Sequence, residues 1–147
     1  MPIVNKIQQH KILLDTHVWY WIAIGEQVFR RDFLRSLELA KENERVLLSS
    51  ISVWEIGMMT AKKKIHLDMD VLDWVEHAIG NLRIKLVSLT PKIAIESSRL
   101  PLEIHGDPAD RMIVASSQEE NALLVTCDTK LIDYGKGRHI SVYNPSK

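Results

Sequence analysis

The sequence predicts an α/β fold in which a mostly parallel central sheet of four to five strands is covered by helices on both faces. Short apolar runs of strand length alternate along the chain with amphipathic segments of helical length, an alternation typical of parallel sheets. Several helical segments also begin with recognisable capping residues. The length of 147 residues, of which 46% are hydrophobic and 26% charged, fits one globular domain with its own core.

Five segments are predicted as strands because each is short, largely apolar and bounded by turn or capping residues. They cover residues 11–14, 46–48, 84–89, 123–126 and 140–143. The sheet has five strands if the last of these segments forms a strand, and four if it does not. Residues 1–10 mix polar and apolar side chains, so we expect them to form a short extension, followed by a single domain over residues 11–147.

Six segments are predicted as helices from their apolar periodicity and their caps. They cover residues 17–24, 27–41, 51–63, a segment that starts after Asp68 or Asp70 and ends at Leu82, 91–100 and 108–121. Thr90-Pro91 and Asp107-Pro108 each provide an N-cap followed by proline at the first helical position. The strands and helices therefore alternate, and ligands of such sheets bind at the carboxyl ends of the strands.

Charge and cysteine content exclude several classes of protein. Cys127 is the single cysteine, so no intramolecular disulfide can form. The longest apolar run has seven residues, 18–24, whereas a membrane-spanning helix needs about 20, so we expect no membrane association and a cytoplasmic location. Acidic and basic residues both number 19, which disfavours a generic nucleic-acid binder. An enzyme that bridges its own acids to phosphate through metal ions remains compatible with this balance.

Four acidic residues are candidates for one site. Asp15 and Asp128 each follow a predicted strand, so both belong to the carboxyl edge of the sheet, although either is also a plausible helix N-cap. Asp110 lies three residues after Asp107, where a capping box and a site acid are equally consistent with the sequence. Glu55 has no cation three or four positions away and lies at the edge of an apolar helical stripe. Such a carboxylate is either protonated or faces a cation from elsewhere.

Other polar and aromatic residues are weaker candidates. Thr16 and Thr126 stand near proposed acids, where a hydroxyl can orient a carboxylate or simply end a strand. His105 lies in a predicted loop, and the run Lys62 to Lys64 sits where cations commonly end a helix. The tryptophans are expected to be core or interface residues; they are Trp19, Trp21, Trp54 and Trp74.

Four segments in order resemble the PIN-domain nucleases, and specifically the VapC toxins of bacterial toxin–antitoxin pairs. The segments are Leu13-Leu-Asp15-Thr-His-Val-Trp19, Ser52-Val-Trp-Glu55-Ile56, Asp107-Pro-Ala-Asp110-Arg-Met112 and Leu124-Val-Thr-Cys-Asp128. The resemblance implies that Asp15, Glu55, Asp110 and Asp128 form an acidic metal site, with support from Thr16 and Thr126. It also implies a Mg²⁺ or Mn²⁺ cofactor, RNA as the substrate and an antitoxin as a partner, and we expect a homodimer.

Three alternatives to a toxin ribonuclease stay open at this point. One is an RNA-processing nuclease of the same family that works without an antitoxin. Another is a receiver-like domain that binds Mg²⁺ and accepts a phosphoryl group, although receivers usually pair adjacent acids near the first strand and Asp15 stands there alone. The third is an inactive domain that only binds partners, which the presence of all four acids disfavours.

Overall fold

The computed structural model describes residues 10–101, 107–136 and 140–147, and its centre is a five-stranded sheet. The strands, in the spatial order β3-β2-β1-β4-β5, are all parallel to their neighbours. Their bounds are β1 Ile12–Leu14, β2 Val46–Ser49, β3 Lys85–Val87, β4 Leu123–Val125 and β5 Val142–Tyr143. The predicted α/β fold is therefore confirmed, with five strands rather than four.

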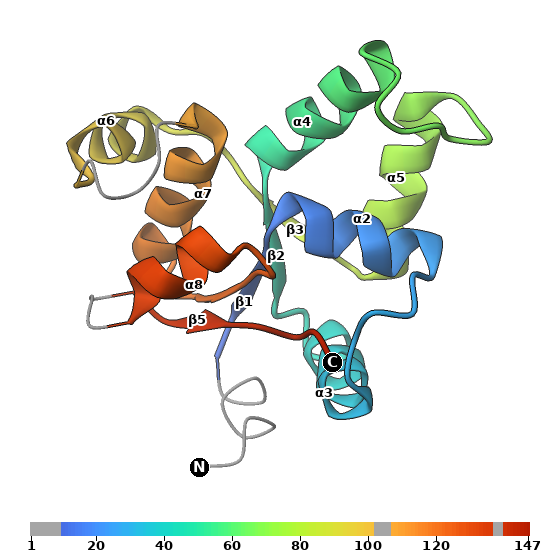
Figure 1. Cartoon of the computed structure of the whole chain (residues 1–147), viewed down its shortest axis with the longest axis horizontal. Helices are drawn as coiled ribbons and strands as arrows, with labels where there is room; N and C mark the ends of the chain where they lie inside the picture. The colour runs from blue at the N-terminus through green and yellow to red at the C-terminus, as the bar shows by residue number, and fades with distance from the viewer. Residues whose placement is uncertain (1–9, 102–106, 137–139) are drawn as a thin grey trace.

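Helices cover both faces of this sheet, as predicted (Figure 1). Within the described residues they are α2 Thr16–Ile24, α3 Arg31–Glu42, α4 Ser50–Ala61, α5 Val71–Asn81, α6 Pro91–Arg99, α7 Pro108–Glu119 and α8 Thr129–Gly135. In Figure 1, α6, α7 and α8 lie on one side of the strands, and α2, α3 and α5 lie on the other. None of these described helices combines the length and the apolar character that crossing a membrane would require.

The central strand β1 shows why both faces are apolar. Successive side chains of a strand point to opposite faces, and Ile12 and Leu14 pack in one cluster with Trp19 of α2. Leu13 packs in a second cluster that includes Ile113 of α7. Since all three β1 side chains are fully buried, the strand reads as an uninterrupted apolar run, which is what a two-sided parallel sheet requires.

Three details differ from the prediction, and the choice between two predicted caps is settled. Helix α3 begins at Arg31 instead of residue 27, because Phe29 forms an antiparallel bridge with Ser146 and Arg30 is the extended N-cap. Strand β3 is shorter than predicted. Asp70, and not Asp68, caps α5 by accepting from the backbone of the first turn. Helix α8 was not predicted, since its seven residues bury one side chain fully and give too short an apolar pattern.

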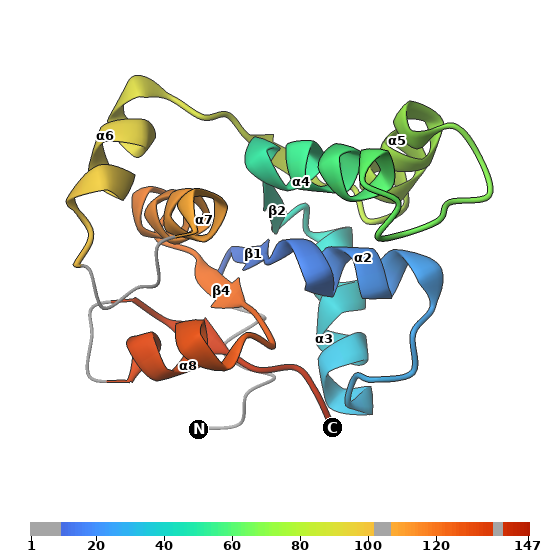
Figure 2. The ribbon, with the colours of Figure 1, turned by 45° about the horizontal axis from the view of Figure 1, so that its top comes forward.

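The tryptophans divide between the core and the surface. Trp19 is fully buried, whereas Trp54 is 55% exposed and is therefore not a core residue. The buried residues of α4 are Ser52 and Ile56, so that helix turns a different side toward the core. Helix α4 contacts both α2 and α7, and in Figure 2 it lies above α2 and to the right of α7.

Candidate functional site

The four candidate acids come together around one cavity at the carboxyl edge of the sheet. Asp15 follows β1, Asp128 follows β4, Glu55 lies on α4, and Asp110 lies in the first turn of α7. The cavity has a volume of about 350 Å³ and is lined by Asp15, His17, Trp21, Glu55, Asp107, Asp110, Cys127 and Asp128. Because these acids come from four segments that are distant in sequence, the parallel topology is what gathers them.

Asp15 is the most buried of the four carboxylates. The backbone N–H of Thr16 donates to its Oδ1 at 2.8 Å, and the hydroxyl of Thr126 donates to its Oδ2 at 2.7 Å. Only 6% of the residue is exposed. Burial raises the pKa of the Asp15 carboxyl above its ordinary value, while the two hydrogen bonds oppose that shift. Asp15 is also the N-cap of α2, so the same residue caps that helix and lines the cavity.

Glu55 is oriented by a hydroxyl pair that connects α2 to α4. Thr16 Oγ1 lies 2.6 Å from Glu55 Oε1 and 2.7 Å from Ser52 Oγ. A hydroxyl carries one proton, so Thr16 donates to the carboxylate when it accepts from Ser52. Burial raises the pKa of Glu55, and the negative charges of Asp15 and Asp107 raise it further. The sequence analysis assigned no role to Ser52.

The hydroxyls of Thr16 and Thr126 each bond a carboxylate that is distant in sequence. The Thr16 hydroxyl contacts Glu55 rather than the adjacent Asp15. The Thr126 hydroxyl donates to Asp15, while it accepts from the backbone N–H of Asp128 at 3.0 Å. The two hydroxyls therefore tie together carboxylate-bearing segments that follow different strands.

The carboxyl group of Asp110 has a strongly raised pKa. Its pKa is raised to about 8, first by burial and then by the negative charges of Asp15, Asp107, Glu55 and Asp128. The cap of α7 is Asp107, whose Oδ1 accepts from the backbone N–H of Ala109 at 2.9 Å. Asp110 thus sits in the first helical turn and also faces the other acids.

Asp128 and four further residues complete the cavity. Asp128 is the N-cap of α8 and accepts from the backbone N–H of Lys130 at 2.8 Å. The other lining residues, to which the sequence pointed less directly, are His17, Trp21, Asp107 and Cys127. Three of them stand next to or close to a candidate acid in the sequence: His17 near Asp15, Asp107 near Asp110 and Cys127 beside Asp128. The exposed lysines 62–64 do not line the cavity, and His105 lies outside the described residues.

The donor chemistry of the cavity fits a divalent cation. Mg²⁺ and Mn²⁺ prefer oxygen ligands, and the four candidate acids supply carboxylate oxygens. Their mutual repulsion is visible in the raised pKa of Asp110, and a bound cation would offset it. Within the described ranges no three acidic, histidine or cysteine side chains form a ready-made metal-binding group. We therefore expect carboxylate side chains to move when an ion binds.

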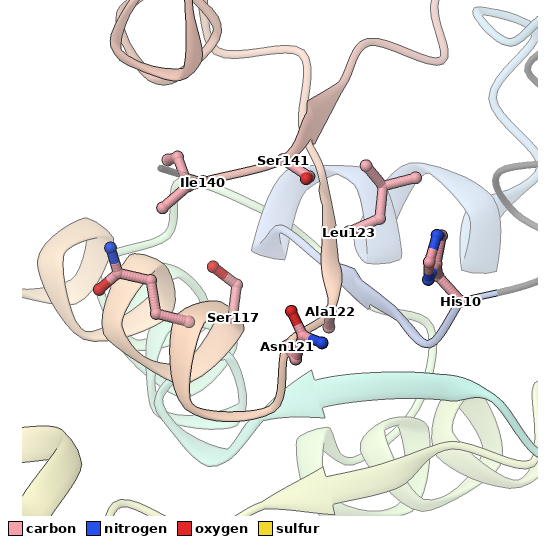
Figure 3. Close-up of a pocket in the computed structure, with 8 residues that line it drawn as sticks. His10, Ser117, Asn121, Ala122, Leu123, Ile140 and Ser141 are labelled. Atoms are coloured by element: carbon pink, nitrogen blue, oxygen red, sulfur yellow. The ribbon is translucent and has the colours of Figure 1, made fainter. Parts of the chain in front are cut away.

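A second cavity, of about 320 Å³, lies at the opposite edge of the sheet (Figure 3). It is lined by the end of α7, the first residue of β4 and residues next to β1 and β5, among them Ser117, Asn121, Leu123 and Ser141. None of its lining residues carries a carboxylate. The acidic cavity is therefore the candidate site.

Removing either threonine hydroxyl is expected to weaken metal binding without unfolding the protein. Thr16→Val and Thr126→Val keep the side-chain shape but release Glu55 and Asp15 respectively, and loss of such an orienting partner typically lowers metal affinity by about 10–100-fold. Titration with Mn²⁺ measures the change. Thr60→Val is the matched control, since the Thr60 hydroxyl bonds only backbone carbonyls within α4. Unchanged Mn²⁺ affinity in both test variants would contradict the orienting role.

Comparison with protein families gives a match to the PIN domain over residues 12–137. The curated protein Ribonuclease VapC22 of Mycobacterium tuberculosis is 32% identical over 132 residues, which make up 90% of this chain and 98% of that protein. The identity extends over nearly the full length of both chains, so the likeness is not confined to the four acidic segments.

Solved structures show the same fold. In the crystal structure of VapBC2 from Rickettsia felis bound to a promoter DNA fragment, one chain matches with a TM-score of 0.68 and 18% identity, covering 90% of this chain and 97% of that one. A chain of a toxin–antitoxin complex from Klebsiella pneumoniae matches with a TM-score of 0.62 and 23% identity, covering 92% and 98%. Sequence, fold and the family match agree, and this chain belongs to the PIN-domain family.

Proposed function

We propose that this chain is a divalent-metal-dependent endoribonuclease whose nuclease domain spans residues 11–147. The observation that carries the proposal is the convergence of Asp15, Glu55, Asp110 and Asp128 on one cavity at the carboxyl edge of the sheet. A relative of 32% identity that bears the name ribonuclease supports RNA as the substrate. The reaction is hydrolysis of a phosphodiester bond by water.

The four acids are proposed as metal ligands and as the catalytic group of the site. When bound there, Mg²⁺ or Mn²⁺ supplies polarisation of the phosphoryl oxygen and lowers the pKa of the attacking water. Asp15 is fixed in place by its two hydrogen bonds, and Glu55 is fixed by Thr16. Asp110, whose pKa is about 8, takes up a proton readily while the cavity holds no cation. The chain thus supplies an acidic surface whose negative charge becomes favourable when a cation binds.

Cleavage of single-stranded or looped RNA is expected in Mg²⁺ or Mn²⁺ and is expected to stop in chelator. Metal-based stabilisation of the transition state is worth several kcal/mol, so the rate should fall by about 100-fold or more without metal. Purified protein is incubated with structured RNAs in each metal and in EDTA, and the products are separated on a denaturing gel. Equal cleavage in EDTA would exclude the proposed metal site.

We propose further that the nuclease is the toxin of a toxin–antitoxin pair and acts in the cytoplasm as a homodimer. The toxin role is supported by similar solved structures, which include VapBC2 bound to promoter DNA, FitAB bound to a DNA fragment and a toxin–antitoxin complex. The alternative within the family is an RNA-processing nuclease without an antitoxin. Light scattering of the purified chain distinguishes a dimer from a monomer.

Expression of the chain alone is expected to slow host growth, and co-expression with the protein encoded directly upstream is expected to restore it. An antitoxin that binds the chain would inhibit the nuclease in the cell. Growth curves after induction measure the effect, with Asp15→Asn as the inactive control. Normal growth during strong expression of soluble, active wild-type protein would favour the RNA-processing nuclease instead.

A further inference from the structure

Two aromatic rings on α2 share the cavity with the acids. His17 and Trp21 are four residues apart, so they lie on the same face of the helix, and both line the cavity. Their ring centroids are 5.7 Å apart with an interplanar angle of 57°. His17 is exposed and Trp21 is partly exposed. An aromatic surface therefore adjoins Asp15 and the other acids that line the cavity.

The position of Trp21 is not explained by the needs of the core. Trp19 is the fully buried tryptophan of α2, and its ring packs 5.4 Å from that of Trp74. Residues two apart on a helix point in nearly opposite directions. Trp21 accordingly makes only partial contact with the core cluster, and it contributes the rest of its surface to the cavity.

The negative charge of the site favours a contact with RNA that does not depend on the phosphate backbone. The chain has a formal net charge of zero, and five of the eight residues that line the cavity are acids, so the protein surface near the site repels an RNA backbone. Stacking on an aromatic ring needs no positive charge, and every nucleobase has a flat face that can stack. Unpaired bases of RNA are commonly recognised in this way.

We propose that Trp21, with the ring of His17 tilted beside it, forms a stacking platform that holds an unpaired base next to the scissile phosphate, so that the site selects single-stranded or looped RNA. The inference rests on the proposed ribonuclease function and names the substrate element that the cavity recognises. Trp21 offers the larger ring and is expected to contribute more than His17. The platform binds the base and takes no part in breaking the bond.

The test compares Trp21→Ala with the conservative Trp21→Phe and with Trp54→Ala, which removes an exposed tryptophan that does not line the cavity. Each protein is assayed on a short single-stranded RNA and on the same RNA with an abasic nucleotide beside the cleavage site. Trp21→Ala should raise KM by about 10-fold with little change in kcat. Wild type should cleave the abasic RNA with a raised KM, and Trp21→Ala should no longer distinguish the two RNAs. His17→Ala should show a smaller change of the same kind.

Trp21→Phe should stay close to wild type, and Trp54→Ala should match wild type. If a folded Trp21→Ala protein kept the wild-type KM and still distinguished the abasic RNA, the platform would be refuted while the nuclease activity stood. If wild type cleaved no RNA, the proposed function would fail, and fluorescence would decide the platform separately. RNA added in Ca²⁺ should quench tryptophan emission in wild type and much less in Trp21→Phe. Equal quenching in both proteins would overturn the inference.

Discussion

The Asp110→Asn protein is expected to be more stable than wild type in chelator, by about 1 kcal/mol, and to lose most of the stabilisation that metal gives. In the folded protein the pKa of Asp110 is about 8, whereas an unfolded aspartate ionises near 4. Holding this group in the cavity at neutral pH therefore opposes folding. Asparagine cannot ionise, so it avoids this cost, and it keeps a hydrogen-bonding side chain.

The sign of the pH dependence follows from the raised pKa. Between about pH 4 and pH 8 the unfolded Asp110 is ionised while the folded one is mostly protonated, so the wild-type apo protein loses stability as pH rises through this window. A full shift of that size corresponds to about 4 kcal/mol at pH 7, and partial exposure of Asp110 reduces it to about 1–3 kcal/mol. The first-turn acid gains only about 0.3–1 kcal/mol from the helix dipole, so the penalty dominates.

Asp73→Asn is the matched control for this comparison. Asp73 follows the N-cap Asp70 at the same spacing by which Asp110 follows Asp107, and it is exposed on α5, away from the acidic cavity. Its replacement should lower the melting temperature slightly and leave the metal response intact. Saturating Mn²⁺ at a hundredfold excess over Kd should stabilise wild type by about 2.7 kcal/mol. An Asp110→Asn protein that melts below wild type in EDTA and keeps this response would make Asp110 a structural cap.

The sheet and the meeting of the acids could be predicted because both depend on local patterns. Asp15 and Asp128 each follow an apolar run of strand length, and parallel strands end at the same edge of a sheet. The capping pairs Thr90-Pro91 and Asp107-Pro108 fixed the starts of two helices correctly. For Glu55 the lack of a nearby cation predicted a protonated carboxyl or a cation from elsewhere; in the folded chain burial raises its pKa, and the hydroxyl of Thr16 contacts it.

The remaining details depend on contacts between distant segments, which no local pattern contains. The start of α3 is set by Phe29 pairing with Ser146. The hydroxyl of Thr126 donates to Asp15 because β1 and β4 are neighbouring strands, which brings the two residues together. The exposed Trp54 shows the same limit. The apolar pattern of α4 alone did not indicate that the side with Ser52 and Ile56 faces the core.

Asp15→Asn is expected to lower kcat/KM for RNA cleavage by about 1000-fold or more while the protein stays folded. Asp15 is the most buried carboxylate of the cavity, and both of its oxygens accept hydrogen bonds that fix its position. An asparagine oxygen can still accept from the Thr16 backbone, and its amide can donate to the Thr126 hydroxyl once that hydroxyl rotates. The substitution therefore removes a ligand charge with little change in shape, and 1000-fold corresponds to about 4 kcal/mol of transition-state stabilisation.

The control for Asp15→Asn is Asp32→Asn. Asp32 accepts from the backbone N–H of Phe33 at 2.8 Å, just as Asp15 accepts from that of Thr16 at 2.8 Å, but Asp32 lies on α3 and does not line the cavity. If loss of the local hydrogen bond impaired the enzyme, both variants would suffer; if loss of a metal ligand does so, only Asp15→Asn would. Steady-state cleavage, Mn²⁺ titration and thermal melts of both variants separate these causes. Cleavage by a folded Asp15→Asn protein at more than a tenth of the wild-type rate would remove Asp15 from the metal site, and the burial of its carboxylate would then have to be explained by its capping of α2 alone.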